Sequence, residues 1–277
     1  MEVSMTLLIV DNEKCKKDGI CAADCPTAII KVDKDEGPKI VPGGDTFCLR
    51  CGHCVAICPH GALSHQEVPL ENCVPLQKER SIDTDQAVQF LRSRRSIRFF
   101  KDKPLDKKTL KRLIEIGRYA PTASNSQLVE WTVFTDKEKI HDIAGQVVDW
   151  MKEILKKDPQ PAYAPYMPMI AGAWDMGFDA VLRDAPGLIL ASAPKEAING
   201  LVDVTLALSY LELAAPCFGL GTCWAGLLYG AMRSHAPIRK TLGLADTVPF
   251  YYPLMIGHPK IRYHRLPERK APKIVWK

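Results

Sequence analysis

Seven cysteines fall within the first 58 residues of this chain, and their spacing is the strongest constraint on its fold. Four of them form a complete run of the pattern C-x2-C-x2-C-x3-C-P, at Cys48, Cys51, Cys54 and Cys58. This pattern is typical of iron–sulfur proteins, because a tight turn can direct thiolates at one cluster while its backbone amides bond the sulfurs. A structural zinc site usually takes two cysteine pairs separated by a longer loop, so the spacing favours iron and sulfide over zinc.

An incomplete copy of this run lies 33 residues earlier. Its members are Cys15, Cys21, Cys25 and Pro26, and Asp18 stands at the position of Cys51. With two such runs, about the first 65 residues resemble the bacterial ferredoxins that carry two iron–sulfur clusters. In that family the fourth cysteine of each run binds the other cluster. The resemblance therefore implies one ligand set of Cys15, Asp18, Cys21 and Cys58, and a second of Cys25, Cys48, Cys51 and Cys54.

Asp18 is where the chain departs from the ferredoxin pattern. A carboxylate is a harder ligand than a thiolate and binds iron less firmly. Four outcomes are open: Asp18 ligates the fourth iron, that iron is labile and a three-iron cluster forms, water fills the place, or Asp18 is only a solvated turn residue before Gly19. The nearby His53, His60 and His65 are interpreted as surface or packing residues, because the cysteines already fill the sites.

Charge and hydropathy argue against several classes of protein. The net charge of +5 is not gathered in one run, so it does not indicate a nucleic-acid partner. The N-terminus shows no signal-peptide pattern, and the other three cysteines are scattered, so we expect a cytoplasmic protein without a disulfide framework. The longest apolar stretch, residues 201–221, contains Asp203 and Glu212, which predicts a core helix and no membrane span.

Residues 66–82 read as a linker between a domain at 1–65 and a domain at 83–277, because they hold two prolines, several charges and little periodicity. Cys73 in this linker is interpreted as a plain thiol. Apolar periodicity then predicts helices from an N-cap at Thr84 to about Arg94, at 107–119 after the cap Asp106, at 137–157 and at 201–217, with strands at 129–135 and 187–193. Residues 158–182 lack a pattern and are either a lid over a substrate or simple packing.

Two polar segments in the second domain are candidates for ligand binding. Arg94, Arg95, Ser96 and Arg98 offer forked guanidinium donors and a hydroxyl, which suit a phosphate, although they could also form a basic surface. The loop 121–127 offers many donors and acceptors between a helix and a buried strand. No GxGxxG follows a strand, so a Rossmann dinucleotide site is not supported.

Four segments taken in order resemble the FMN-dependent nitroreductase superfamily: RRSIR at 94–98, APTASNSQ at 120–127, GLGTCWAG at 219–226 and RLPERKAP near the C-terminus. The resemblance spans residues 85–277. It implies an α+β fold with a mostly antiparallel sheet flanked by helices, and a homodimer with FMN in its interface. The residues it implies for FMN binding are Arg94, Arg95, Ser96, Arg98, Thr122, Asn125, Gln127, Cys223, Trp224, Ala225, Gly226 and Arg269. An exposed tail charge is the alternative for Arg269.

The two resemblances together predict an iron–sulfur flavoprotein oxidoreductase. Clusters carry single electrons, and a flavin can accept them singly and deliver two at once. We expect an external low-potential donor, such as a ferredoxin, to load the clusters, and FMN to reduce a small electrophilic substrate of nitro, quinone or enone type. The reverse direction is open, and the motifs name no acid–base residue. The alternative is a non-catalytic electron carrier or redox sensor.

Overall fold

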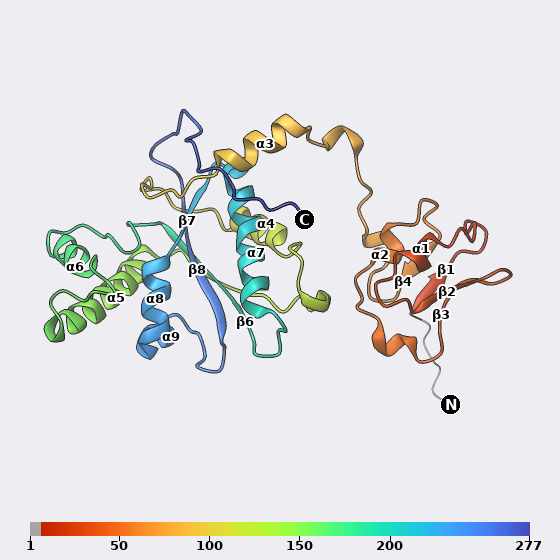
Figure 1. Cartoon of the computed structure of the whole chain (residues 1–277), viewed down its shortest axis with the longest axis horizontal. Coiled ribbons are helices and arrows are strands. Elements are labelled where there is room, and N and C mark those ends of the chain that lie inside the picture. Colours follow the sequence, from red (N-terminus) through yellow and green to blue (C-terminus); the bar gives the residue numbers. More distant parts are fainter. Residues whose placement is uncertain (1–6) are drawn as a thin grey trace. The chain divides into compact units, whose positions relative to one another are not determined.

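The computed structural model describes residues 7–277, which divide into two compact units. The first comprises residues 7–81 together with Ser124–Ser126, and the second comprises residues 82–123 and 127–277 (Figure 1). Each unit has its own hydrophobic core.

The first unit is built from two antiparallel strand pairs and two short helices. Strand β1 (Leu8–Val10) pairs with β4 (Leu63–His65), and β2 (Ile30–Asp33) pairs with β3 (Gly37–Ile40). Helices α1 (Ile20–Ala23) and α2 (His53–Ala56) have four residues each. The small core contains both aliphatic side chains and cysteines of the two runs, so several of the expected cluster ligands also pack this unit.

The backbone repeats itself with the 33-residue period found in the sequence. Helices α1 and α2 begin at Ile20 and His53, which are 33 positions apart. The three pairs of matched residues with a left-handed backbone are Lys17 and Arg50, Gly19 and Gly52, and Ala28 and Gly61. A left-handed conformation is costly for residues with a side chain, so its recurrence at non-glycine positions shows that both halves need the same tight turns.

Part of the expected linker packs on the first unit. Val68 forms a β-bridge with His65, and the backbone amide of Leu70 donates to Ser64 Oγ over 3.0 Å. The break between the two units falls after Ser81. The segment contains two short 3₁₀ turns, Leu70–Asn72 and Lys78–Arg80, and its contacts with Ser64 and His65 hold its first half against the first unit.

The second unit contains a four-stranded sheet in which every neighbouring pair is antiparallel. The spatial order is β5 (Glu130–Phe134), β6 (Gly187–Ala193), β8 (Phe250–Gly257) and β7 (Gly221–Trp224). Its helices are α3 (Thr84–Ser93), α4 (Lys107–Gly117), α5 (Lys137–Lys157), α6 (Met167–Asp175), α7 (Gly200–Ala214), α8 (Gly226–Ser234) and α9 (Ala236–Thr241). The expected α+β fold with an antiparallel sheet is confirmed.

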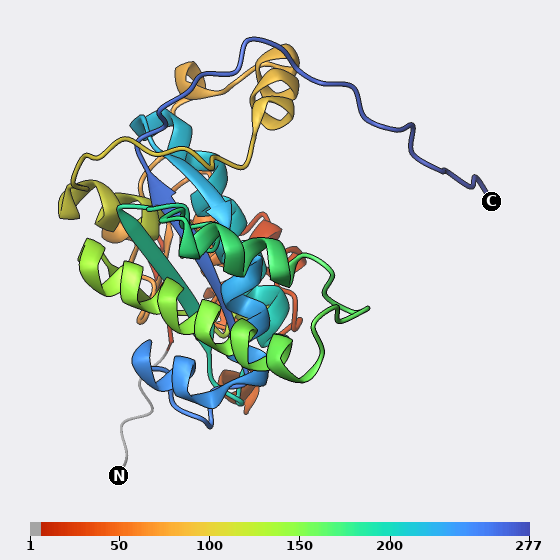
Figure 2. The same cartoon turned by 90° about the vertical axis from the view of Figure 1, so that its left-hand side faces the viewer.

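Two hydrophobic layers lie on opposite faces of this sheet. Successive strand residues point to opposite faces, so Leu188 and Leu190 of β6 enter one layer while Ile189 and Ala191 enter the other. Figures 1 and 2 show α5, α6, α8 and α9 over the first face and α4 and α7 over the second. The inner strand β6 is therefore buried on both sides, while the edge strand β5 is largely exposed.

The elements follow the apolar periodicity closely, with differences at helix ends: α4 ends at Gly117 and not at 119, and α7 spans Gly200–Ala214 and not 201–217. Helix α5 and strand β6 have the expected bounds, and Asp106 caps α4 as expected. Helix α3 is capped by Asp83 and not by Thr84, because Asp83 and Gln86 form a capping box in which each side chain bonds the other residue's backbone amide. The unpatterned residues 158–182 contain α6, which packs on α5 through Trp174 and His141.

Helix α7 and the turn after it, Gly200–Phe218, are long and apolar enough to cross a membrane by length and composition. In the structure α7 packs against β6, β8 and α4. It carries two buried acids, Asp203 and Glu212, which hydrogen-bond to other parts of the second unit. The structure therefore uses it as a core helix, in agreement with the sequence analysis.

The segment that follows α3 runs along the edge strand β7. The amide of Ile97 donates to the carbonyl of Thr222 over 2.8 Å, and the Ile97 side chain lies directly on Gly221. Two more backbone bonds join this segment to the end of β8: Lys101 donates to His258, and Lys260 donates to Phe99. The arginine-rich run is thus fixed against the sheet.

The close packing of Ile97 on β7 depends on the missing side chain of Gly221. A Cβ at position 221 would overlap Ile97 and approach Pro259, so we expect Gly221→Ala to lower the free energy of unfolding of the second unit by about 1–3 kcal/mol. Urea unfolding followed by tryptophan fluorescence measures this change. Gly172→Ala in α6 is the matched control, because its Cβ would meet open space and should leave stability equal or slightly higher. Equal stability of both variants would contradict the packing described here.

Candidate cofactor sites

The first unit contains two cavities, and each is lined by one of the expected ligand sets. One cavity is lined by Cys25, Cys48, Cys51 and Cys54 among its residues. The other is lined by Cys15, Asp18, Cys21 and Cys58. In each set the fourth member comes from the opposite run, so the chain crosses between the halves as the ferredoxin resemblance implies.

The spacing of these side chains suits a cluster better than a single ion. Within residues 7–277, no three His, Cys, Asp or Glu side chains come close enough together to hold one metal ion. A zinc ion needs four ligands at about 2.0–2.3 Å from one centre. An iron–sulfur cluster is wider and is held by thiolates around its periphery. The donor set therefore fits two iron–sulfur clusters.

Backbone and side-chain donors already surround several of these sulfurs. Burial raises the pKa of Cys25, but hydrogen bonds from the amide of Ile29 and from Thr27 outweigh it and hold that pKa below its usual value. The amide of Ala62 donates to Cys58 Sγ over 3.4 Å. Burial raises the pKa of Cys54 to about 11, so cluster assembly must displace a proton there.

Asp18 lies in the cavity with the three thiols of the incomplete run. One carboxylate oxygen accepts a hydrogen bond from the amide of Ile20 over 3.2 Å, and the other lies 3.6 Å from His60 Nε2. The side chain is 44% exposed, so water reaches it. The carboxylate thus lines the same cavity as the three thiols, next to Gly19 in the left-handed turn that both runs share.

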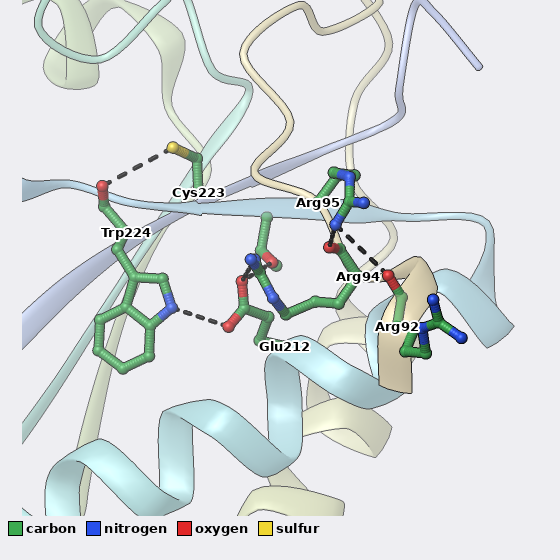
Figure 3. Close-up of polar contacts among 7 residues, drawn as sticks. Arg92, Arg94, Arg95, Glu212, Cys223 and Trp224 are labelled. Atoms are coloured by element: carbon green, nitrogen blue, oxygen red, sulfur yellow. Dashed lines mark hydrogen bonds and ion pairs between the residues drawn. The ribbon is translucent and has the colours of Figure 1, made fainter. Parts of the chain in front are cut away.

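In the second unit, Arg94 ties the arginine run to the core. Its Nη1 donates to Glu212 Oε1 of α7 over 2.9 Å, and Trp224 Nε1 donates to Oε2 of the same carboxylate over 2.8 Å (Figure 3). Thr222 Oγ1 lies 3.5 Å from Oε1. The side chain of Glu212 is only 6% exposed, so these donors stabilise a buried charge. Arg94, Trp224 and α7 are thereby locked together.

Arg95 turns back on the end of α3. Its Nη1 donates to the carbonyls of Arg94 and Arg92 over 2.6 and 3.4 Å (Figure 3). These contacts fix the chain direction after the helix. Cations at a helix C-terminus also stabilise the helix dipole.

Ser96 and Arg98 lie beside the buried thiol of Cys223. Burial raises the pKa of Cys223, while the charge of Arg98, a hydrogen bond with Ser96 and the charge of Arg183 act in the opposite direction. The Ser96 hydroxyl therefore lies beside Cys223 of β7, and the positive charges of Arg98 and Arg183 act on the same thiol. These donors suit a phosphate, so the residues present fit FMN.

The polar loop 121–127 is held by its own hydrogen bonds. Thr122 Oγ1 accepts from the amide of Gln127 over 3.0 Å, and the amide of Ala123 donates to Asp203 over 3.1 Å. Asn125 belongs to the three residues that group with the first unit. Asn125 and Gln127 both have a left-handed backbone, which is unusual outside glycine and often marks a functional loop.

Ala225 and Gly226 form the start of α8 directly after β7. The amide of Ala225 donates to the carbonyl of Pro253 over 3.0 Å. The ring of Trp224 meets Tyr252 edge-on at 4.9 Å, and Tyr252 stacks on Tyr229 at 4.2 Å. Figure 2 shows the C-terminal segment that contains Arg269 extending away from the sheet. Arg269 is exposed.

Comparison with known proteins identifies both parts of the chain. Residues 91–258 match the model of the nitroreductase family. The chain belongs to the nitroreductase family. Residues 7–59 match the model of a 4Fe-4S dicluster domain. Membership makes the chain an FMN-dependent oxidoreductase, and the N-terminal domain adds two iron–sulfur clusters.

Individual relatives show the same division. An FMN reductase [NAD(P)H] of Bacillus subtilis is 26% identical over 188 residues, covering 66% of this chain and 70% of the relative. The polyferredoxin MvhB of Methanothermus fervidus is 36% identical over 75 residues, covering 26% of this chain and 16% of the relative. A nitroreductase with bound FMN from Bacteroides fragilis shares the fold with a TM-score of 0.56 at 18% identity, covering 69% of this chain and all of the other.

Three residues near the nitroreductase site were missed by the sequence analysis as site residues. The sequence analysis identified Glu212 only as an acid in an apolar helix. An acid at a position expected to be buried indicates a buried ion pair, which the structure contains. Arg183 was overlooked, although it stands before a buried strand with its backbone left-handed. Tyr252 gave no signal, because an aromatic residue in a strand is ordinary packing.

The structure separates the roles of two arginines, and this separation can be tested. Arg94→Ala leaves the buried Glu212 without its ion-pair partner, so we expect stability to fall by about 1–3 kcal/mol, discounted because Arg94 is 30% exposed. Arg98→Ala removes an exposed cation and should weaken FMN binding roughly 10- to 100-fold with little loss of stability. Urea unfolding of the apoprotein and FMN titration by fluorescence quenching measure the two effects. The reverse assignment would contradict these roles.

Asp18 can be tested by replacing its carboxylate. If Asp18 holds the fourth iron, protein purified without oxygen contains about eight irons per chain, and Asp18→Ala contains about seven with a three-iron EPR signal. Asp18→Cys restores the complete run and should retain about eight irons more firmly, because thiolate is the softer ligand. A three-iron signal in the unmodified protein would rule out ligation by Asp18.

Proposed function

We propose that the two clusters pass electrons to FMN on the same chain, and that the bound FMN reduces a small electrophilic organic substrate of nitro, quinone or enone type. The observation that carries this proposal is the presence of two complete ligand cavities and a phosphate-suited donor group in one protein. When bound, FMN supplies the exchange between single electrons and a two-electron, hydride-like transfer. A chain that holds both kinds of cofactor avoids a collision with a separate donor at that step.

The residues of this chain have three tasks in the proposal. Seven thiolates, with Asp18, hold the clusters. Ser96 and Arg98, with Arg95 nearby, hold the phosphate end of FMN, while Arg94 fixes their segment to α7. The start of α8 at Ala225 and Gly226 lies beside the flavin ring, and the loop 121–127 completes the site through Thr122, Asn125 and Gln127. Arg269 contributes from the C-terminal segment.

Electrons reach the clusters from an external low-potential donor such as a ferredoxin. The Bacillus subtilis relative is named as acting with NAD(P)H, so a nicotinamide cofactor is a second candidate donor at the flavin. The site needs no Rossmann motif for that role, because the nicotinamide would bind in the substrate slot. The unpaired thiols of the ten cysteines suit the reducing cytoplasm.

A homodimer is part of the proposal. Helix α3 has no buried residue, and its apolar side chains Val88 and Leu91 are 44% and 56% exposed. Helix α7 exposes Leu201, Val202 and Tyr210 on the side that does not face the sheet. Apolar side chains gathered on helices in this way support burial against a second copy, as in the family.

A non-catalytic electron carrier or redox sensor is the other candidate function. Such a protein would not need an ordered phosphate site. The Ser96 hydroxyl and the charge of Arg98 near Cys223 favour the enzyme.

A donor-specific comparison tests the proposed electron route. Cys51→Ser removes a ligand of the second cluster, so we expect it to keep FMN but to lose most turnover of a quinone or nitroaromatic when reduced ferredoxin is the donor. Cys73→Ser is the matched control, since Cys73 lines neither cavity and only bonds the carbonyl of Pro69. Both variants should react equally when dithionite reduces the flavin directly.

Two results would contradict the proposal. Full ferredoxin-driven turnover by Cys51→Ser, with its second cluster shown to be lost, would exclude the route through that cluster. Loaded protein that cycles between oxidised and reduced states without reducing any nitro, quinone or enone compound would favour the electron carrier.

A further inference from the structure

His65 differs from the other histidines of the first unit. It ends strand β4, where it pairs with Leu8, and only 2% of its surface is exposed. His53 and His60 are exposed. His65 also lines the cavity of the second ligand set, which it enters from the strand side. A buried polar ring in such a small core needs a hydrogen-bonding reason to be there.

Both ring nitrogens of His65 have partners, and together they fix the position of its proton. Nδ1 accepts a hydrogen bond from the amide of Glu67 over 3.0 Å, so Nδ1 carries no proton. In a neutral imidazole the proton is then on Nε2. Nε2 lies 3.6 Å from Cys48 Sγ, within reach of an N–H···S hydrogen bond. The ring therefore points its one donor at a cluster ligand.

We propose that His65 is a positioning residue that donates this N–H to the Cys48 thiolate and raises the reduction potential of the cluster held by Cys25, Cys48, Cys51 and Cys54. Reduction adds one electron to that cluster and increases the negative charge on its sulfurs. A hydrogen bond to a sulfur stabilises that extra charge, so it favours the reduced form. The inference rests on the ligand assignment of the proposed function.

The internal repeat supplies a comparison within the same molecule. The position 33 residues before His65 is Val32, which lines the other cavity and has no group that can donate a hydrogen bond. The two halves share their turns and helices, so this difference acts on one cluster alone. The cluster beside His65 is therefore the one that is reduced more easily because of this bond.

The surroundings of His65 keep the ring in this orientation. Arg50 Nε pairs with Glu67 Oε1 over 2.8 Å, which holds the residue whose amide donates to Nδ1. Strand pairing with β1 fixes the backbone on the other side. A rotated ring would lose both hydrogen bonds, so the Cys48 contact is built into the local fold.

The test is a redox titration of the full-length protein, followed by EPR under anaerobic conditions. We expect His65→Leu to shift the midpoint potential of one cluster to a more negative value and to leave the other cluster unchanged. His65→Gln carries an amide donor at similar reach and should recover part of the shift. His53→Leu is the matched control, because His53 lines the same cavity but makes no hydrogen bond to a sulfur. Iron and sulfide counts accompany each variant.

A spectroscopic measurement keeps the inference testable if His65→Leu fails to fold. Protein labelled with ¹⁵N-histidine should show a nitrogen coupling in the EPR spectrum of one reduced cluster, which is lost in His65→Gln and kept in His53→Leu. An unchanged midpoint potential in a fully loaded His65→Leu, or no histidine coupling in the unmodified protein, would overturn the inference. A Cys48→Ala variant that keeps both clusters intact would instead refute the ligand assignment on which it rests.

Discussion

The convergence of seven thiols and one carboxylate on two cavities determines the first unit. Its apolar core is small, and the cysteines themselves are part of it. A domain of this size has little hydrophobic burial to stabilise it, so metal ligation supplies folding energy that packing cannot. This requirement explains the costly left-handed turns at Lys17, Arg50 and Ala28, because only tight turns bring three ligands of one run to the same cluster.

The second unit depends on a different buried charge. Glu212 enters the core on α7 and needs donors there, and Arg94 and Trp224 supply them from two other segments. The ion pair with Arg94 thus joins α7 to the arginine run, and the hydrogen bond from Trp224 joins α7 to the edge strand β7. One result is that Ser96 and Arg98 reach the end of β7 in a fixed position. Arginine therefore stabilises the fold at position 94 and suits a phosphate ligand at position 98.

Much of this could be predicted from the sequence, because the signals were local. Periodicity located α5 and β6, and the ferredoxin resemblance implied the two residue sets that line the cavities. The cap at Asp83 was misplaced by one residue, since Thr84 is also a good cap in isolation and only the pairing with Gln86 decides between them. The bond between Arg94 and Glu212 joins positions 118 residues apart, so no local pattern reveals it. His65 was interpreted as a packing or surface residue for the same reason.

Comparing the two halves of the repeat shows where sequence change has chemical consequences. The helices and left-handed turns match, so the backbone tolerates little variation. The cysteines of the two runs match at three positions, but two other side chains that line the cavities do not: Asp18 stands opposite Cys51, and Val32 stands opposite His65. A carboxylate among the ligands and a hydrogen bond to a sulfur each alter a cluster without altering the fold. Under the proposals for Asp18 and His65, two sites with one architecture acquire different redox properties, and inequivalent sites can order the passage of electrons in a way that two identical clusters cannot.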